Sequence, residues 1–192
     1  MINQNYLQSM KRQFLYYKSL GEKAIAQIED EKKLFYQFNE DSNSIAIIVK
    51  HLSGNMISRW TDFLTSDGEK EWRNRDGEFE NDIKTRAEVI AVWDKGWDRL
   101  FKTLDEIKPD DLEKIIYIRN EGHTVMEAIN RQLAHYPYHI GQIVYIAKMI
   151  KSSAWESLSI PRNKSKDYNA GKFSEPKSQK HFTDEFLKKK KD

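Results

Sequence analysis

Two histidines one helical turn apart, His135 and His139, are the residues of this sequence best placed to do chemistry. They belong to the run 131–142, which lies inside an apolar stretch with a helical period. Residues i and i+4 share one face of a helix, so their imidazoles can bind one metal ion with little rearrangement. A third histidine, His51, lies in another stretch with a helical period. Three histidines from two helices would form an open metal site, with a position left for water or substrate.

Four long segments have the hydrophobic spacing of amphipathic helices and would position these histidines. We predict helices over residues 5–30, 44–64, 86–107 and 125–151. Thr85 with Glu88, and Thr124 with Glu127, match the capping box that begins a helix. Four helices of this length predict an all-α fold, a four-helix bundle, which can hold a metal between facing helices.

The segments between and after these helices are less regular. Residues 67–82 are polar and predict a long loop, whereas residues 113–122 predict a short strand or hairpin before the fourth helix. We place the helical domain at residues 1–156 and an extended C-terminal arm, partly docked on it, at 157–192. The lysine run 188–191 predicts a solvated tail.

Pro137 falls between the two histidines of the fourth predicted helix. A proline inside a helix removes one backbone hydrogen bond and usually kinks the axis. The kink could aim the imidazole rings, or it could have no functional role, and the sequence leaves both interpretations open.

Several other side chains could act around the metal. Four could reach the pocket or orient its imidazoles, with ordinary structural roles as the alternative: Asn55, Gln132, Tyr138 and Gln142. Arg73 and Arg75 could bind an anionic group of a substrate, because arginine pairs bidentately with carboxylates, or they could form salt bridges in an exposed loop.

The remaining aromatic and histidine residues predict structural roles. We expect packing from four aromatic side chains, Trp60, Trp93, Trp97 and Tyr136. His123 directly precedes the fourth helix and predicts an exposed or capping position, and His181 lies in the polar arm and predicts an exposed one.

Composition excludes several function classes. The chain has 192 residues, a net charge of +2 and no cysteine, so disulfides, a protein thiolate and cysteine-bound zinc are excluded. The basic residues do not indicate a nucleic-acid binder, and no apolar run is long enough to suggest a membrane span. Without a signal-peptide pattern, we expect a cytoplasmic protein.

The chain resembles the DinB superfamily (DinB/YfiT-like metalloenzymes), and more narrowly an uncharacterised DinB-like subfamily. The matching motifs lie at residues 48–55, 63–76, 130–142 and 158–162, and the resemblance extends to about residue 172. It implies an up-down-down-up four-helix bundle, usually a homodimer. It also implies one divalent ion, zinc or nickel, on His51, His135 and His139. Some relatives are thiol-dependent transferases or isomerases that use bacillithiol or mycothiol.

These features predict a metal-dependent enzyme that acts on a small molecule. A metal on three neutral imidazoles can lower the pKa of a bound water or thiol toward neutrality. With no cysteine, any thiolate must come from a cofactor such as bacillithiol or from the substrate, which fits thiol S-transfer and hydrolysis equally. No general base is evident beside the triad. The alternatives are therefore a non-catalytic protein with a structural or stress-related metal, and a helical scaffold whose histidines bind nothing.

Overall fold

The computed structural model describes residues 1–187 of the chain, which are mostly helical. This part of the chain forms six α-helices: α1 (Ile2–Ala26), α2 (Ile45–Trp60), α3 (Arg86–Glu106), α4 (Val125–Lys151), α5 (Ser165–Ser174) and α6 (Asp184–Leu187). The strands β1 (Ile115–Ile118) and β2 (Glu121–Thr124) form one antiparallel sheet. The lysine run 188–191 lies outside the described residues.

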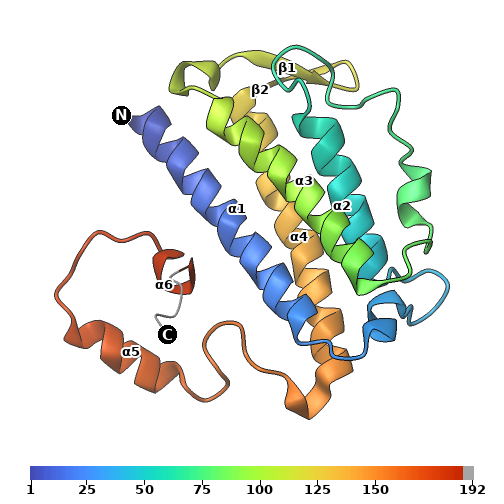
Figure 1. Cartoon of the computed structure of the whole chain (residues 1–192). Coiled ribbons are helices and arrows are strands. Elements are labelled where there is room, and N and C mark those ends of the chain that lie inside the picture. The colour runs from blue at the N-terminus through green and yellow to red at the C-terminus, as the bar shows by residue number, and fades with distance from the viewer. Residues whose placement is uncertain (188–192) are drawn as a thin grey trace.

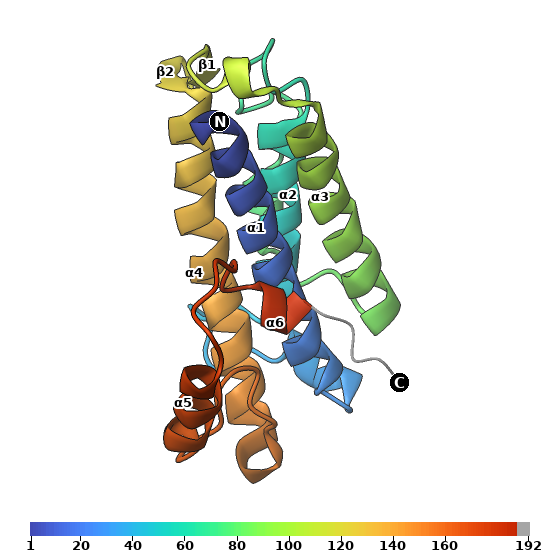
Figure 2. The same ribbon diagram turned by 90° about the vertical axis from the view of Figure 1, so that its left-hand side faces the viewer.

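The four long helices lie side by side and enclose the core (Figures 1 and 2). Helix α1 packs against α4 and α2 against α3, and further contacts join α2 to α4 and α1 to α3. Helices α1 and α4 begin at the end of the molecule that carries the small sheet, whereas α2 and α3 end there (Figure 1). The facing sides of α2 and α4 are where the predicted histidines lie. No helix among residues 1–187 has both the length and the apolar character needed to cross a membrane.

Local capping fixes where three of the long helices begin. The predicted capping boxes of Thr85 with Glu88 and of Thr124 with Glu127 are both present, and the Ser44 hydroxyl accepts from the Ile47 amide. The fourth helix therefore has the predicted bounds. The first helix begins and ends earlier than predicted, and α2 ends at Trp60, before the predicted residue 64.

The core beneath the histidines is aromatic. Trp60, Trp93, Trp97 and Tyr136 are all buried, which confirms their predicted packing role. The Trp60 Nε1–H donates to the Tyr136 hydroxyl at 2.9 Å, and that hydroxyl donates to Asn55 Oδ1 at 3.1 Å. Because a buried polar group left unpaired is costly, this chain of bonds fixes how α4 lies against α2.

The predicted hairpin is present and is tied to the loop that follows α2. Ile115 pairs with Thr124 and Ile118 with Glu121, and the turn residues Arg119 and Asn120 have positive φ values of 56° and 61°. The Asp67 carboxylate accepts from both turn amides at 2.8 Å. This contact places Arg119 beside the loop that also carries Arg73 and Arg75.

The C-terminal arm returns to α1. Helix α5 was not predicted, and α6 lies against α1 (Figure 2), where the Phe182 and Phe186 rings contact Tyr16. The prediction that His181 is exposed was wrong. Its ring is half-buried and bonds the Ser9 and Thr183 hydroxyls at 3.1 and 2.7 Å, because the arm folds onto α1.

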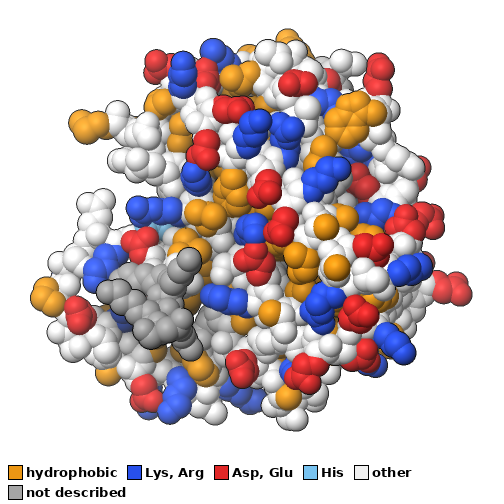
Figure 3. Space-filling view, in the orientation of Figure 1, with side chains coloured by type: hydrophobic (Ala, Val, Ile, Leu, Met, Phe, Trp, Pro, Cys, Tyr) orange, Lys and Arg blue, Asp and Glu red, His pale blue; other side chains and the backbone are white. Residues whose placement is uncertain are grey.

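Acidic and basic side chains are interspersed over the face shown in Figure 3. Among residues 1–187, the side chains on that face form no single-sign patch large enough to indicate a charged partner. Five arginines line a cavity beside the histidines.

Close contact between α2 and α3 depends on Gly96. A Cβ there would lie 2.7 Å from the Ser53 Cα, a backbone atom that cannot move aside. We therefore predict that Gly96→Ala lowers the free energy of unfolding by about 1–3 kcal/mol, the usual effect of overpacking. Gly141→Ala in α4 is the matched control, since its Cβ would meet no atom within 4 Å, and it should leave stability equal or higher. Urea denaturation measures the free energy of unfolding of both variants. Equal values for Gly96→Ala and Gly141→Ala would contradict the close contact between α2 and α3.

Candidate metal centre

The three predicted histidines meet in one place. His51 on α2 and His135 and His139 on α4 each offer a ring nitrogen, and these nitrogens lie within 4.8 Å of one another. The Nε2 atom of His135 is 3.4 Å from that of His51 and 3.1 Å from that of His139. Nitrogens about 2.0–2.1 Å from a tetrahedral zinc are about 3.3 Å apart, so these spacings fit a single metal ion. Within residues 1–187, no other group of histidine, cysteine and carboxylate side chains is arranged this way.

Hydrogen bonds to the outer ring nitrogens turn the lone pairs of two histidines toward this point. His51 Nδ1 lies 2.9 Å from a Glu78 carboxylate oxygen, and His139 Nδ1 lies 3.0 Å from the Gln142 side-chain oxygen. Both partners are hydrogen-bond acceptors, so each Nδ1 carries the proton. Each Nε2 is therefore unprotonated, and its lone pair can bind a metal ion. This second layer of contacts is typical of histidines that bind metals.

The carboxylate behind His51 is itself clamped. Arg73 donates to the two Glu78 oxygens from Nε at 2.7 Å and Nη2 at 2.9 Å, a bidentate pair in which both side chains are less than a tenth exposed. Burial alone would raise the pKa of Glu78, but the hydrogen bonds from His51 and Arg73 outweigh it and hold that pKa below its usual range. Glu78 is therefore ionised at neutral pH.

Glu78 lies in a short 3₁₀ helix, Asp76–Phe79, that packs against α2 over Gly54. A Cβ at Gly54 would lie 2.6 Å from the Glu78 carboxyl carbon, so only glycine leaves room for this carboxylate. Residues 67–82 were predicted to form a long loop, and no role was predicted for Glu78. Its distance of 27 residues from His51 gives no periodic signal, although a Phe beside a Glu in a polar segment could have indicated a buried turn.

The environment of His135 and His139 favours neutral imidazoles. Burial, together with the neighbouring His139, lowers the pKa of His135 to about 3, and burial also lowers the pKa of His139. Neutral imidazole is the form that binds metals, so at pH 7 neither ring needs to lose a proton to do so.

The triad forms one wall of a cavity of about 440 Å³. Its other walls carry five arginines, Arg59, Arg73, Arg75, Arg119 and Arg131, together with Asn55, Phe79, Gln132 and Tyr138. Of the four residues predicted to reach the pocket, Asn55, Gln132 and Tyr138 line it, and Gln142 contacts it through His139. His123, in β2, does not line it.

The two predicted arginines differ in their surroundings. Arg73 is 2% exposed in its side chain and its guanidinium is bonded to Glu69 and Glu78. Arg75 is exposed, with its guanidinium 5.3 Å from the centre of the Phe79 ring. Phe79 in turn stacks on His51 at 4.9 Å, which places Arg75 on the open side of the triad.

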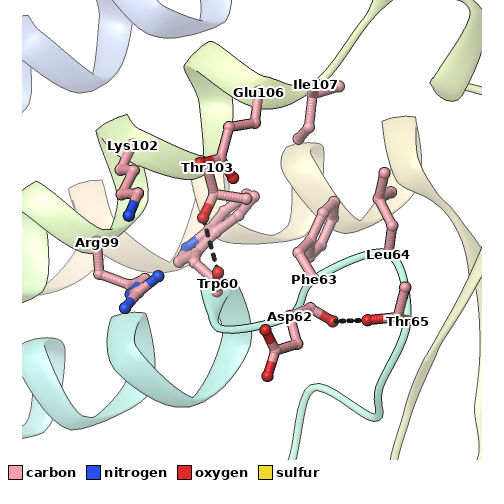
Figure 4. Close-up of a pocket in the computed structure, with 10 residues that line it drawn as sticks. All are labelled: Trp60, Asp62, Phe63, Leu64, Thr65, Arg99, Lys102, Thr103, Glu106 and Ile107. Atoms are coloured by element: carbon pink, nitrogen blue, oxygen red, sulfur yellow. Dashed lines mark hydrogen bonds between the residues drawn. The ribbon is translucent and has the colours of Figure 1, made fainter.

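A second cavity, of about 330 Å³, lies where α2 ends (Figure 4). Two of its lining residues, Thr103 and Trp60, are joined by a 2.7 Å hydrogen bond from the threonine hydroxyl to the tryptophan carbonyl. Asp62 and Glu106 are its carboxylates, and it contains no histidine. Its side chains are therefore poorly suited to a transition metal, whereas the cavity at the triad is lined by three imidazoles.

Comparison with known proteins identifies a family without a described activity. No curated protein and no solved structure matches the chain. The model of the family described as "Protein of unknown function (DUF1572)" matches residues 1–164, which include the four long helices and all three histidines. The chain therefore belongs to the DUF1572 family.

Proposed function

We propose that this protein binds one divalent ion, zinc or nickel, through His51, His135 and His139, and uses it to activate a small molecule. The observation that carries the proposal is that one ring nitrogen from each of the three histidines lies within 4.8 Å of the other two, with the His135 Nε2 atom 3.4 Å from that of His51 and 3.1 Å from that of His139. Zinc held by three protein ligands keeps a fourth position for water or substrate. Here the cavity lies on that open side.

We further infer that the family is DinB-like, as the sequence motifs imply. The directions and contacts of α1 to α4 support the up-down-down-up four-helix bundle expected for that superfamily. From the sequence alone, we also propose a cytoplasmic homodimer. In each chain, residues 1–156 form the helical domain and residues 157–192 form the C-terminal arm.

The chemistry follows from the donor set. A divalent ion bound by these imidazoles would lower the pKa of a water or a thiol in its open position. The chain's own residues orient the ligands: Glu78 holds the Nδ1 proton of His51 and Gln142 holds that of His139. Because the chain has no cysteine, a thiolate would belong to a cofactor such as bacillithiol or to the substrate. The proposed reaction is thus thiol transfer or hydrolysis.

Metal content tests the ligand assignment. We predict about one zinc or nickel ion per chain in protein purified without a histidine tag, and almost none in His135→Ala, because two imidazoles alone bind weakly. His181→Ala is the matched control, since it removes a histidine distant from the triad. Elemental analysis after dialysis gives the result, and full metal content in His135→Ala would contradict the assignment.

Removal of the metal separates an active ion from a structural one. The buried hydrophobic core extends over all four long helices, so the chelated protein should keep its helical circular dichroism and a cooperative thermal transition. Loss of the fold on chelation would instead support a structural metal, the non-catalytic alternative.

The buried carboxylate gives a second prediction. Glu78→Gln keeps the size of the side chain but removes the negative charge that accepts the hydrogen bond from His51 Nδ1. We expect zinc affinity to fall about 10- to 100-fold, as is usual when a partner of a ligating histidine is lost. Competition with a chromogenic chelator measures the affinity. The exposed neighbour variant Glu80→Gln should bind zinc as the parent does, and equal affinities in both variants would contradict the role of Glu78.

A further inference from the structure

The cavity beside the triad is strongly cationic. Five guanidinium groups line it, and among residues 1–187 only Glu69 and Glu78 form ion pairs with them. Glu69 is shared by three of the five, namely Arg59, Arg73 and Arg119. The nearby Asp67 carboxylate is bound by backbone amides of the hairpin turn and of residue 69. Positive charge therefore exceeds negative charge in the cavity even before a metal adds its own.

The arginines with the freest charge lie on the open side. Within the described residues, Arg75 and Arg131 form no ion pair, and both side chains belong to exposed residues. Arg75 rests on Phe79, which leaves the edges of its guanidinium available for hydrogen bonds. Arg119 is exposed and contacts only one oxygen of Glu69. Three elements, the loop after α2, the hairpin turn and α4, thus each present one guanidinium to the same cavity.

Gln132 supplies an independent sign of a ligand. Its residue is 3% exposed, it lines the cavity, and its side-chain oxygen is buried without a hydrogen-bond partner among the described residues. An unpaired buried polar atom costs free energy unless a water or a ligand bonds it, and among residues 1–187 Gln132 and Arg59 are the residues with such an atom that line this cavity. A polar group of a bound molecule would satisfy it.

We propose that the cavity binds a small organic anion, whose carboxylate or phosphate group lies on Arg75, Arg119 and Arg131 and whose hydrogen-bond donor lies on Gln132. This inference rests on the proposed function, because it takes the anion to be the substrate that the metal activates. The volume of about 440 Å³ limits the ligand to the size of a metabolite. Arg73 has a different role, since its N–H groups bind Glu69 and Glu78. It thereby holds in place the Glu78 carboxylate that bonds His51.

Binding of succinate to the full chain tests this inference. The probe carries two carboxylates, and succinamide is its neutral analogue of the same shape. By calorimetry we expect saturable binding of succinate that weakens with added salt, and no binding of succinamide. Inorganic phosphate is titrated in parallel into chelated protein. Comparison of its affinity with that of succinate shows whether the arginines prefer a phosphate or a carboxylate.

Variants locate the binding. Arg75→Gln and Arg131→Gln should each weaken succinate binding about tenfold, the loss expected for one charge-assisted contact. Arg162→Gln removes an exposed arginine outside the cavity and should bind as the parent does. Gln132→Leu should weaken binding of a hydroxylated dicarboxylate such as malate more than that of succinate, because only the hydroxyl can donate to the amide oxygen.

The two proposals fail in different ways. The titrations are made with zinc-loaded and with chelated protein, since the arginines do not require the metal. Normal zinc content with no saturable binding of succinate or phosphate, or with equal binding in the arginine variants, overturns the anion site and leaves the metal centre standing. Anion binding that depends on Arg75 and Arg131 in protein that takes up neither zinc nor nickel supports the site and overturns the proposed function.

Discussion

The buried carboxylate of Glu78 is the interaction on which the candidate site depends. An ionised carboxylate loses much of its hydration when it is buried, and it is retained only where donors replace the water. Arg73 and His51 are those donors, so the carboxylate joins the loop after α2 to the helix that carries the first ligand. The same bond fixes which nitrogen of His51 faces the other two histidines. Loop position, imidazole orientation and metal-ligand geometry are thus set together.

The second constraint is the packing of α4 on α2. His135 and His139 share one face of α4 because they are four residues apart, but only the distance between the helices brings that face to His51. The bonds from Trp60 through Tyr136 to Asn55 connect the two helices directly beneath the triad. A rigid aromatic core therefore positions the ligands, while the loop and the hairpin turn supply the cationic side of the cavity.

Hydrophobic periodicity and capping motifs predicted the local elements of the fold. The bounds of α4, the capping boxes of Thr85 and Thr124, and the hairpin before α4 all follow from local patterns, and the triad follows from helical spacing together with a resemblance. The role of Glu78 could not be predicted, because it depends on a loop folding back over Gly54. The docking of His181 was missed for the same reason, since it depends on the arm reaching α1.

The arginines of the cavity are a further feature that local sequence patterns could not predict. Arg75, Arg119 and Arg131 are separated by 44 and 12 residues along the chain, and the structure brings them to one cavity through three different elements. A net charge of only +2 gave no hint of a local excess of positive charge. Such an excess is physically consistent with neutral side chains at His135 and His139, because burial lowers both pKa values and Arg59 and Arg73 lower that of His135 further.

X-ray absorption spectroscopy of the zinc-loaded protein is the sharpest test of the three-histidine centre, because it counts the ligands of the metal and identifies imidazoles. We expect three imidazole nitrogens at about 2.0–2.1 Å and one additional oxygen or nitrogen ligand, which a sulfur atom replaces when a small thiol is added. Fewer than three imidazoles, or a fourth ligand from the protein that no added thiol displaces, would contradict an open three-histidine centre.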